Sequence, residues 1–264
     1  MVELLQDLKE NHHVKGIKAE FEAEGTRLEE SMRLKEIITK AGLDLTIKIG
    51  GCEAIRDLYE ARILGVTRIV APMIESSYAL KKFLTATKQI FPEEERDAIS
   101  LLINIETIDG YQKFQSMLEI EEIGELDGIV LGRVDMTGSM GRTREYVNSE
   151  EIFNLTNNLF SLAKSKGLEC IIGGGLSNET IPFLRNLSDG LVDGYETRKV
   201  IFQCPEALDE GYDIGILKAI SFELMWLKNK RNFYGMIFEE DRTRIDMLQK
   251  RYDKLQFELG GMLR

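Results

Sequence analysis

The sequence is poor in cysteine and in long apolar runs, and both shortages exclude classes of protein. Its 264 residues include three cysteines, Cys52, Cys170 and Cys204, which lack the paired spacing of a disulfide framework or a zinc site. We therefore expect buried thiols in a reducing cytoplasm. No apolar run approaches the length of a membrane span, and the first residues do not resemble a signal peptide. The expected protein is cytoplasmic and has no membrane partner.

Positive charge and histidine are also scarce. Lysine and arginine number 34 against 45 acidic residues, so the formal net charge is −11, which argues against nucleic acid as a partner. A small anionic substrate is compatible with this charge, because a site on an acidic protein can be locally positive. The only histidines, His12 and His13, precede the first clear strand. A histidine general base at the ends of the strands is therefore not expected.

What the chain does have is a regular alternation of strand-like and helix-like segments. The expected strands are 16–23, 45–50, 68–74, 100–106, 128–133, 169–173 and 192–202. The expected helices are 27–40, 52–64, 76–91, 108–122, 149–166 and 178–187, the first of them with a capping box at Thr26 and Glu29. Such alternation, without a flexible linker or an internal repeat, indicates a parallel sheet in one barrel-like domain.

The length fits a TIM-type (β/α)8 barrel, but only seven strands are clear. The first ten or so residues look helical, so an eighth strand is absent or lies within 11–19, and an irregular first strand is part of the expected barrel. A doubly wound open sheet is the alternative, because periodicity alone does not distinguish it. We assign residues 1–206 to the barrel domain.

Residues 207–264 are expected to form a C-terminal helical extension. A heptad seam marks its last part, at Ile245, Leu248, Tyr252, Leu255 and Leu259. Such a seam either packs on the chain's own barrel or contacts another subunit. The regular spacing beyond the last strand favours a homo-oligomer.

Two strand-like runs each end in a carboxylate. LLINIET at 101–107 stops at Glu106, and GIVLGRVD at 128–135 stops at Asp135. The carboxyl ends of barrel strands form the catalytic rim, and Mg²⁺ or Mn²⁺ needs few protein ligands there. A cation held by both residues would polarise a carbonyl and stabilise an enolate. Either carboxylate by itself would instead be a helix cap or a surface acid.

The glycine-rich stretch 132–141 follows the second run and is expected to be a loop. Its first residues, Gly132, Arg133, Val134 and Asp135, would offer backbone amides to a substrate carboxylate. A simple chain turn is the alternative. The triplet Gly173–Gly175 ends another strand and would leave space for a ligand or only turn the chain.

Lys48 and the acids of the first strand are the remaining candidates. Lys48 interrupts an apolar strand near its end, where it would neutralise an enolate, act as a base or Schiff-base nucleophile, or pair with a structural acid. Glu20, Glu22 and Glu24 repeat on one face, with Lys18 and Lys48 as the obvious partners in an ion-pair layer. Glu22 and Glu24 lie nearest the rim, so they are the candidates for a general acid or base.

These motifs resemble the HpcH/HpaI aldolase and citrate lyase β-subunit family of phosphoenolpyruvate/pyruvate-binding barrels. The matching stretches are INIET at 103–107, DGIVLGRVDMTGSMG at 127–141, RIVAPMIES at 68–76 and GIKAEFEAEG at 16–25. The resemblance runs from about 16 to 202 and omits the helical extension.

By this resemblance, Glu106 and Asp135 would be the divalent-metal ligands. The backbone amides of Val134 and Asp135 would receive the carboxylate of a pyruvate-like unit, and the reaction would be reversible aldol cleavage. Two departures matter. Lys48 stands where the family usually has an arginine, and the aldolase branch has a histidine base where this chain reads 22–26.

The leading hypothesis is therefore a metal-dependent carbon–carbon lyase or aldolase that acts on a 2-oxo acid or an acyl thioester. Lys48 would stabilise the enolate oxygen, and Glu22 or a bound water would move the proton. One alternative is a phosphoenolpyruvate-utilising transferase on the same barrel. Another is a catalytically altered barrel that serves as a binding or assembly subunit.

Overall fold

The computed structural model describes residues 1–188 and 190–259. The chain divides into two compact units, residues 1–222 and residues 223–264, and each is described by itself. The boundary at 206/207 proposed from the sequence stays a prediction. The last helix, α10, begins in the first unit and supplies the described part of the second.

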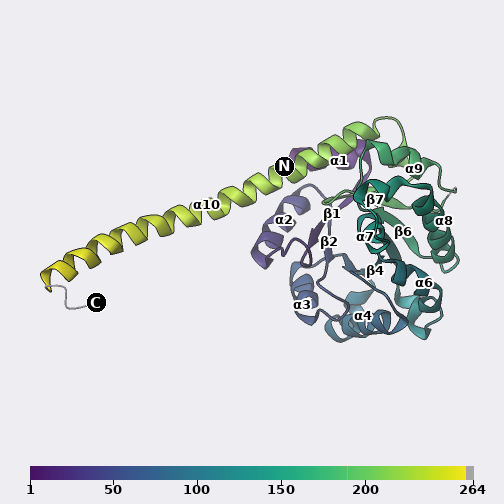
Figure 1. The fold of residues 1–264 in the computed structure, drawn as a ribbon, viewed down its shortest axis with the longest axis horizontal. Coiled ribbons are helices and arrows are strands. Elements are labelled where there is room, and N and C mark those ends of the chain that lie inside the picture. Colours follow the sequence, from purple (N-terminus) through teal and green to yellow (C-terminus); the bar gives the residue numbers. More distant parts are fainter. Residues whose placement is uncertain (189, 260–264) are drawn as a thin grey trace. The chain divides into compact units, whose positions relative to one another are not determined.

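The first unit is a closed eight-stranded barrel surrounded by helices, so the predicted fold class is confirmed (Figure 1). The strands follow one another around the barrel as β1 Val14–Glu20, β2 Asp44–Lys48, β3 Arg68–Ala71, β4 Ser100–Ile105, β5 Gly128–Gly132, β6 Glu169–Gly173, β7 Gly194–Glu196 and β8 Val200–Gln203. Neighbouring strands from β1 to β7 pair in parallel.

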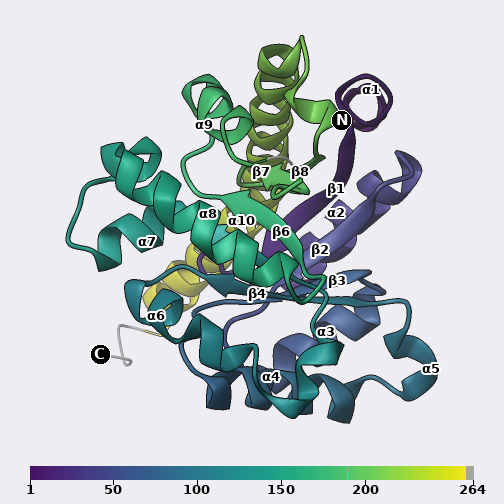
Figure 2. The same cartoon turned by 90° about the vertical axis from the view of Figure 1, so that its right-hand side faces the viewer.

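Helices between the strands cover the outside of the barrel (Figure 2). They are α2 Leu28–Lys40, α3 Ile55–Leu64, α4 Ser77–Ile90, α5 Glu93–Arg96, α6 Ile108–Met117, α7 Arg133–Ser139, α8 Glu150–Lys164 and α9 Ile181–Arg185. Helix α1 Val2–His12 precedes β1, and α10 Tyr212–Glu258 follows β8. Short 3-10 turns lie at Glu121–Glu125, Arg144–Asn148, Asn178–Thr180 and Glu206–Leu208.

The eighth strand lies where the sequence predicted one long strand. Segment 192–202 is a hairpin of β7 and β8, turned at Thr197, whose amide donates to the carbonyl of Val200 at 2.9 Å. Strand β8 is antiparallel to both β7 and β1. The open-sheet alternative was therefore wrong, as was the expectation that an eighth strand is absent or lies within 11–19, because apolar residues on both sides of Thr197 made the hairpin look like one strand. The irregular first strand is confirmed by a register shift between Val14 and Gly16.

The predicted capping box at the start of α2 is also wrong. The N-cap of α2 is Arg27, which makes no side-chain cap hydrogen bond. Thr26 instead donates to Glu24 Oε2 at 3.3 Å. The acidic neighbour offers the hydroxyl a partner, so the local cap spacing was misleading here.

The inside of the barrel changes character along its axis. At the middle of the central strands, an apolar layer consists of Val70, Leu102, Val130 and Ile171. Because alternate residues of a strand face the same side, the inward series of β4 continues from Leu102 through Asn104 to Glu106. The apolar layer thus separates the polar side chains at the carboxyl ends of the strands from the Arg68–Glu169 ion pair at the amino ends.

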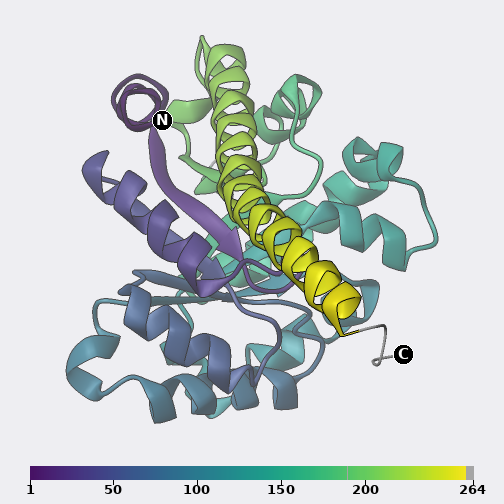
Figure 3. The same cartoon turned by 90° about the vertical axis from the view of Figure 1, so that its left-hand side faces the viewer.

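The second unit, as far as residue 259, is formed by α10 and its last turn (Figure 3). The expected helical extension is confirmed, with its regular helix beginning at Tyr212. The predicted seam residues from Ile245 to Leu259 are exposed. Within the described residues, neither α10 nor another helix is long and apolar enough to cross a membrane.

Candidate functional site

The predicted site residues lie at the carboxyl ends of neighbouring strands. Glu106 directly follows β4 and is 2% exposed. Asp135 is the third residue of α7, so the stretch after Gly132 begins as a helix and not as the expected loop. The small residues of this stretch are typical of loops, but they also allow a short helix to pack closely against the rim. Glu106 and Asp135 are nonetheless brought to the same end of the barrel.

Glu106 is fixed by three donors. Its Oε1 accepts from the amide of Met73 at 3.0 Å, and its Oε2 accepts from Asn104 Nδ2 at 2.7 Å. Lys48 Nζ lies 3.4 Å from the same Oε2. Met73 has a positive φ of 49°, an uncommon conformation for a residue with a side chain. This turn at the end of β3 presents the Met73 amide to the carboxylate and fixes its orientation.

Gly132 leaves the space that Glu106 occupies. A Cβ at residue 132 would lie 2.7 Å from Glu106 Oε2 and 2.8 Å from Glu106 Cβ. No side chain fits at that distance without moving the carboxylate. The glycine at the end of β5 therefore has a steric role, beside the substrate-binding role predicted for it.

Lys48 lies between two carboxylates. Its Nζ is 2.8 Å from Glu22 Oε2 and 3.4 Å from Glu106 Oε2. Burial by itself would lower the pKa of Lys48, but Glu106 and then Glu22 outweigh burial and raise this pKa above its usual value. The side chain is thus an ammonium that donates hydrogen bonds. The geometry disfavours the Schiff-base interpretation, because a nucleophilic amine must be neutral.

Asp135 and Glu106 interact through their charges. Asp135 is exposed as a residue, but partial burial of its carboxylate, followed by the charge of Glu106, raises its pKa. Lys48 acts in the opposite direction and does not cancel the shift. The pair carries more negative charge than the nearby lysine neutralises, so a cation would be favoured between them.

Arg133 has a buried side chain that holds the backbone in place. Its guanidinium donates to Asn148 Oδ1 at 2.7 Å and to the carbonyls of Gly174, Gly173 and Val147 at 2.9, 3.2 and 3.2 Å. Burial lowers its pKa to about 10. These contacts join α7 to the end of β6. The side chain of Arg133 is thus used within the protein. The predicted substrate-binding role of Arg133, which concerns its backbone amide, stays a prediction.

The glycine triplet comes close to the first turn of α7. Gly174 has φ +75°, and a Cβ there would lie 2.7 Å from the Val134 nitrogen and 2.8 Å from the Arg133 nitrogen. First-turn amides of a helix have no partner within the helix. The triplet, expected to leave space at the rim, keeps a side chain away from these amides.

A second group of charges lies on the side of β1, β7 and β8. Lys18 Nζ is 3.1 Å from Glu20 Oε1 and 2.5 Å from Glu196 Oε1. Lys199 pairs with Glu24. The predicted ion-pair layer is present, with Glu196 and Lys199 as partners whose facing the sequence left open. Glu24 therefore pairs with Lys199 and not with Lys48.

Asn104 is the residue that sequence reasoning missed. It is 5% exposed, and its Oδ1 is buried without a hydrogen-bond partner among the described residues. The signal was available, since Asn104 precedes Glu106 by two residues and therefore shares its face of β4. A buried acceptor of this kind is unusual and suits a bound donor or cation.

The oxygen atoms of this region fit a hard divalent cation. No cluster of three or more His, Cys, Asp or Glu side chains placed to hold a metal occurs within 1–188 and 190–259. Mg²⁺ and Mn²⁺ do not need such a cluster, because one or two carboxylates suffice when substrate and water complete the shell. Glu106, Asp135 and the amide oxygen of Asn104 supply oxygen donors only, which suits these metals.

Comparison with known proteins gives a family match and a shared fold. Residues 48–174 match the family model HpcH/HpaI aldolase/citrate lyase, which confirms the resemblance inferred from the motifs and supports a lyase or aldolase type of function. No curated protein matches the chain.

Solved structures resemble the chain at low identity. An HpcH/HpaI aldolase from Desulfitobacterium hafniense DCB-2 is 10% identical, with 74% of this chain and 81% of that chain covered and a TM-score of 0.60. Citrate synthase SbnG is 14% identical, with 88% and 91% covered and a TM-score of 0.60. An HpcH/HpaI aldolase/citrate lyase family protein from Burkholderia cenocepacia J2315 is 11% identical, with 86% and 100% covered and a TM-score of 0.56. These likenesses show the fold.

Proposed function

We propose that this barrel, which matches the HpcH/HpaI aldolase and citrate lyase family over residues 48–174, is a divalent-metal-dependent carbon–carbon lyase or aldolase. Its substrate is a 2-oxo acid or an acyl thioester that reacts through a pyruvate-like enolate. The observation that carries the proposal is the position of Lys48 Nζ, 2.8 Å from Glu22 and 3.4 Å from Glu106. A cationic donor, a proton acceptor and a candidate metal ligand thus lie together at the barrel rim.

Glu106 and Asp135 would hold Mg²⁺ or Mn²⁺, with Asn104 orienting Glu106 through its side-chain amide. When bound, such a cation supplies positive charge to a substrate carbonyl oxygen. The backbone amides of Val134 and Asp135 would bind the substrate carboxylate beside Gly174.

Lys48 and Glu22 would carry the proton chemistry. In cleavage, Glu22 takes the proton of the substrate hydroxyl while the carbon–carbon bond breaks, and Lys48 donates a hydrogen bond to the enolate oxygen that forms. The enolate carbon then takes this proton from Glu22, which restores the carboxylate and completes the 2-oxo acid. A lysine offers one compact charge in place of an arginine's two-pronged donor, so Glu22 and Glu106 have to fix its direction.

Deuterium exchange into the methyl group of pyruvate tests enolate formation without knowledge of the natural substrate. In D₂O with Mn²⁺, the wild-type protein should exchange the methyl protons of pyruvate for deuterium, which proton NMR follows. Electron paramagnetic resonance should show that Mn²⁺ is bound. Asp135→Ala should lose both signals. Asp109→Ala, an equally exposed first-turn acid of α6, is the matched control and should keep both.

An Asp135→Ala protein that binds Mn²⁺ and exchanges pyruvate normally would contradict the proposal. The same assay separates the alternatives. A binding or assembly subunit would give no exchange in the wild-type protein, even with Mn²⁺ bound. A phosphoenolpyruvate-utilising transferase would consume phosphoenolpyruvate in the presence of an acceptor.

A further inference from the structure

Helix α10 carries a heptad series that begins well before the seam predicted from the sequence. We call the series within the second unit the α10 seam. Its a positions are Leu224, Arg231, Phe238, Ile245, Tyr252 and Leu259, and its d positions are Leu227, Tyr234, Asp241, Leu248 and Leu255. Phe238 is 65% exposed and Ile245 is 63% exposed. A long seam of exposed apolar side chains is the pattern of a helix that pairs with another helix.

Two charged residues interrupt the α10 seam, and they select the orientation of the partner. Arg231 is at an a position and Asp241 is at a d position, and both are exposed. In a parallel, in-register pair of identical helices, each residue meets its own copy, which places arginine against arginine and aspartate against aspartate. In an antiparallel pair, a positions meet d positions. Only the antiparallel pair can therefore bring Arg231 of one chain to Asp241 of another.

The register that aligns these two charges also aligns the apolar residues. It is centred on Met236, midway between Arg231 and Asp241. The layers next to the charged pair are then Phe238 with Tyr234, Ile245 with Leu227 and Leu248 with Leu224. No layer of the seam from Leu224 to Leu248 leaves a charge against an apolar side chain.

Further layers of the same register remain apolar. They are Tyr252 with Ile220 and Leu255 with Leu217, which are both exposed residues of α10 before the unit boundary. A register chosen for one charged pair thus makes every other layer from Leu217 to Leu255 apolar, and only the outermost a position, Leu259, meets a charged residue, Asp213. This agreement is what a seam built for one partner would show.

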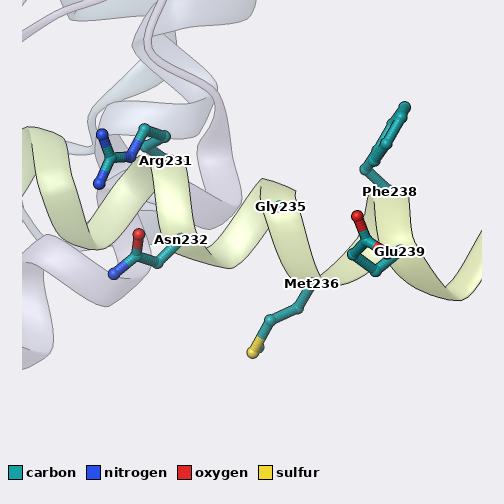
Figure 4. Close-up of a pocket in the computed structure, with 6 residues that line it drawn as sticks. All are labelled: Arg231, Asn232, Gly235, Met236, Phe238 and Glu239. Atoms are coloured by element: carbon teal, nitrogen blue, oxygen red, sulfur yellow. The ribbon is translucent and has the colours of Figure 1, made fainter.

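We propose that α10 forms an antiparallel coiled coil with α10 of a second copy of this chain, with the two-fold axis at Met236. Figure 4 shows the side chains around that centre, where Arg231, Asn232, Gly235, Met236, Phe238 and Glu239 line a shallow hollow on the helix. Of these six residues, Arg231 and Phe238 belong to the seam. The homo-oligomer expected from the sequence thereby acquires a defined interface.

The residues that flank the seam are compatible with this register. Gly235 and Ile237 each face their own copy across the axis, and nothing lies within 4 Å of a Cβ placed at Gly235. By the same rule, Lys228 lies beside Arg242 of the second copy and Lys230 beside Arg244, which would be repulsive for free charges. Arg242 is already paired within its own helix with Glu239 at 2.5 Å, and Arg244 with Glu240. These pairings reduce the repulsion.

The orientation is tested by disulfide formation in the full-length protein. Because Cys170 and Cys204 are buried and Cys52 is only half-buried, the background is Cys52→Ser. Leu248→Cys by itself should give no disulfide-linked dimer, since its partner in the second copy is Leu224. Adding Leu224→Cys should give a covalent dimer on non-reducing gels. The two positions are separated by roughly 36 Å along one helix, which excludes a bond within one chain.

A disulfide-linked dimer from Leu248→Cys without the second substitution would show a parallel pair and overturn the proposal. Absence of cross-linking in the double variant would overturn it as well. Sedimentation equilibrium of the wild-type protein must also show self-association, so a monomer at every concentration would contradict the inference.

Charge reversal tests the layer that selects the register. Asp241→Arg should raise the dissociation constant of the dimer about 100-fold, because Arg231 of each copy then meets an arginine of the other copy. Arg231→Asp combined with Asp241→Arg should restore the wild-type dissociation constant. Asp246→Arg makes the same change off the seam and should leave the dissociation constant within about threefold. Equal effects of Asp241→Arg and Asp246→Arg would exclude the charged layer.

Discussion

Two groups of charged side chains lie inside the same barrel and differ in how completely they are paired. In the closed cluster, Lys18 contacts both Glu20 and Glu196. In the open cluster, Lys48 contacts Glu22 and Glu106, while Asp135 adds a third carboxylate. Both clusters follow the rule that a buried charge needs a partner. With the neighbouring Lys199–Glu24 pair, the closed cluster has two lysines for three carboxylates, whereas the open cluster has one lysine for three, so the open cluster has the larger excess of negative charge.

The carboxyl pKa values show the consequence. Burial opposes the ionised form of Glu20, but Lys18 outweighs burial and lowers the pKa of that carboxyl. In the open cluster, partial burial and Glu106 raise the pKa of Asp135 despite Lys48. The closed cluster is therefore complete as a structural element, whereas the open cluster is arranged to receive a positive charge. Perturbed carboxylates of this kind are concentrated at functional sites.

The largest expected effect comes from the open cluster. Glu106→Gln should lower the rate of Mn²⁺-dependent pyruvate exchange roughly 1,000-fold, because it removes both a metal ligand and a charge partner of Lys48. The rate is measured by proton NMR and Mn²⁺ affinity by calorimetry. Glu196→Gln makes the same change in the closed cluster and should leave Mn²⁺ affinity within a few-fold. Equal losses in the two variants would remove the distinction between the clusters.

Removal of the closed-cluster cation should affect stability and not metal binding. Lys18→Met leaves Glu20 and Glu196 buried without a counter-ion, which should reduce the free energy of unfolding by about 3 kcal/mol. Urea denaturation measures this loss, and Mn²⁺ affinity of the folded variant should be unchanged. Adding Glu196→Leu should recover part of the stability. A stable Lys18→Met protein with weakened metal binding would assign Lys18 to the site.

A steric change should disturb the open cluster without altering its charge. Gly132→Ala places a Cβ 2.7 Å from the present position of Glu106 Oε2, so the carboxylate must move. Mn²⁺ affinity should fall about 30-fold, a loss that calorimetry can resolve. Gly138→Ala, where nothing lies within 4 Å of the added Cβ, is the control and should bind Mn²⁺ normally. An unchanged Gly132→Ala protein would show that Glu106 does not hold the metal.

The smallest expected effect concerns Asn104. Asn104→Leu removes the 2.7 Å hydrogen bond to Glu106 at similar side-chain volume, and a lost supporting contact of this type costs about tenfold in metal affinity. Asn104→Gln keeps both an amide donor and an oxygen acceptor and should retain more Mn²⁺ binding than the leucine variant. If the leucine and glutamine variants both bind Mn²⁺ as the wild-type protein does, Asn104 does not orient the ligand.

The sequence predicted the barrel because its periodicity is local. Helices such as α2 and α4 begin and end within a residue or so of their predicted bounds, and the long C-terminal helix was expected from its spacing. The β7–β8 hairpin was missed, since the apolar residues on both sides of Thr197 read as one strand. Local pattern thus indicated that a strand was there, and hydrogen bonding determined where it turned.

Within the candidate site, the sequence showed which residue types stand at the ends of the strands. It did not show which side chains pair with one another. Glu106 and Lys48 were placed correctly at strand ends, and Lys48 was expected to pair with an acid. Asn104 was overlooked, although it precedes Glu106 by two residues and therefore faces the same side of β4. The helical setting of Asp135 was hidden by a glycine-rich stretch that resembles a loop.

The sequence by itself determined the alternation of strands and helices, the acids and lysines available at the rim, and the heptad series of α10. Only the tertiary structure decided which charges satisfy one another. Lys18 and Glu196 are 178 residues apart and meet at 2.5 Å, because closure of the barrel places β1 and β7 on either side of β8. That closure uses Lys18 and Lys199 in one cluster and leaves Lys48 with more carboxylates than it can neutralise. Local periodicity specifies strands and helices, but the balance of charge in a cavity depends on residues that meet only after the chain has folded.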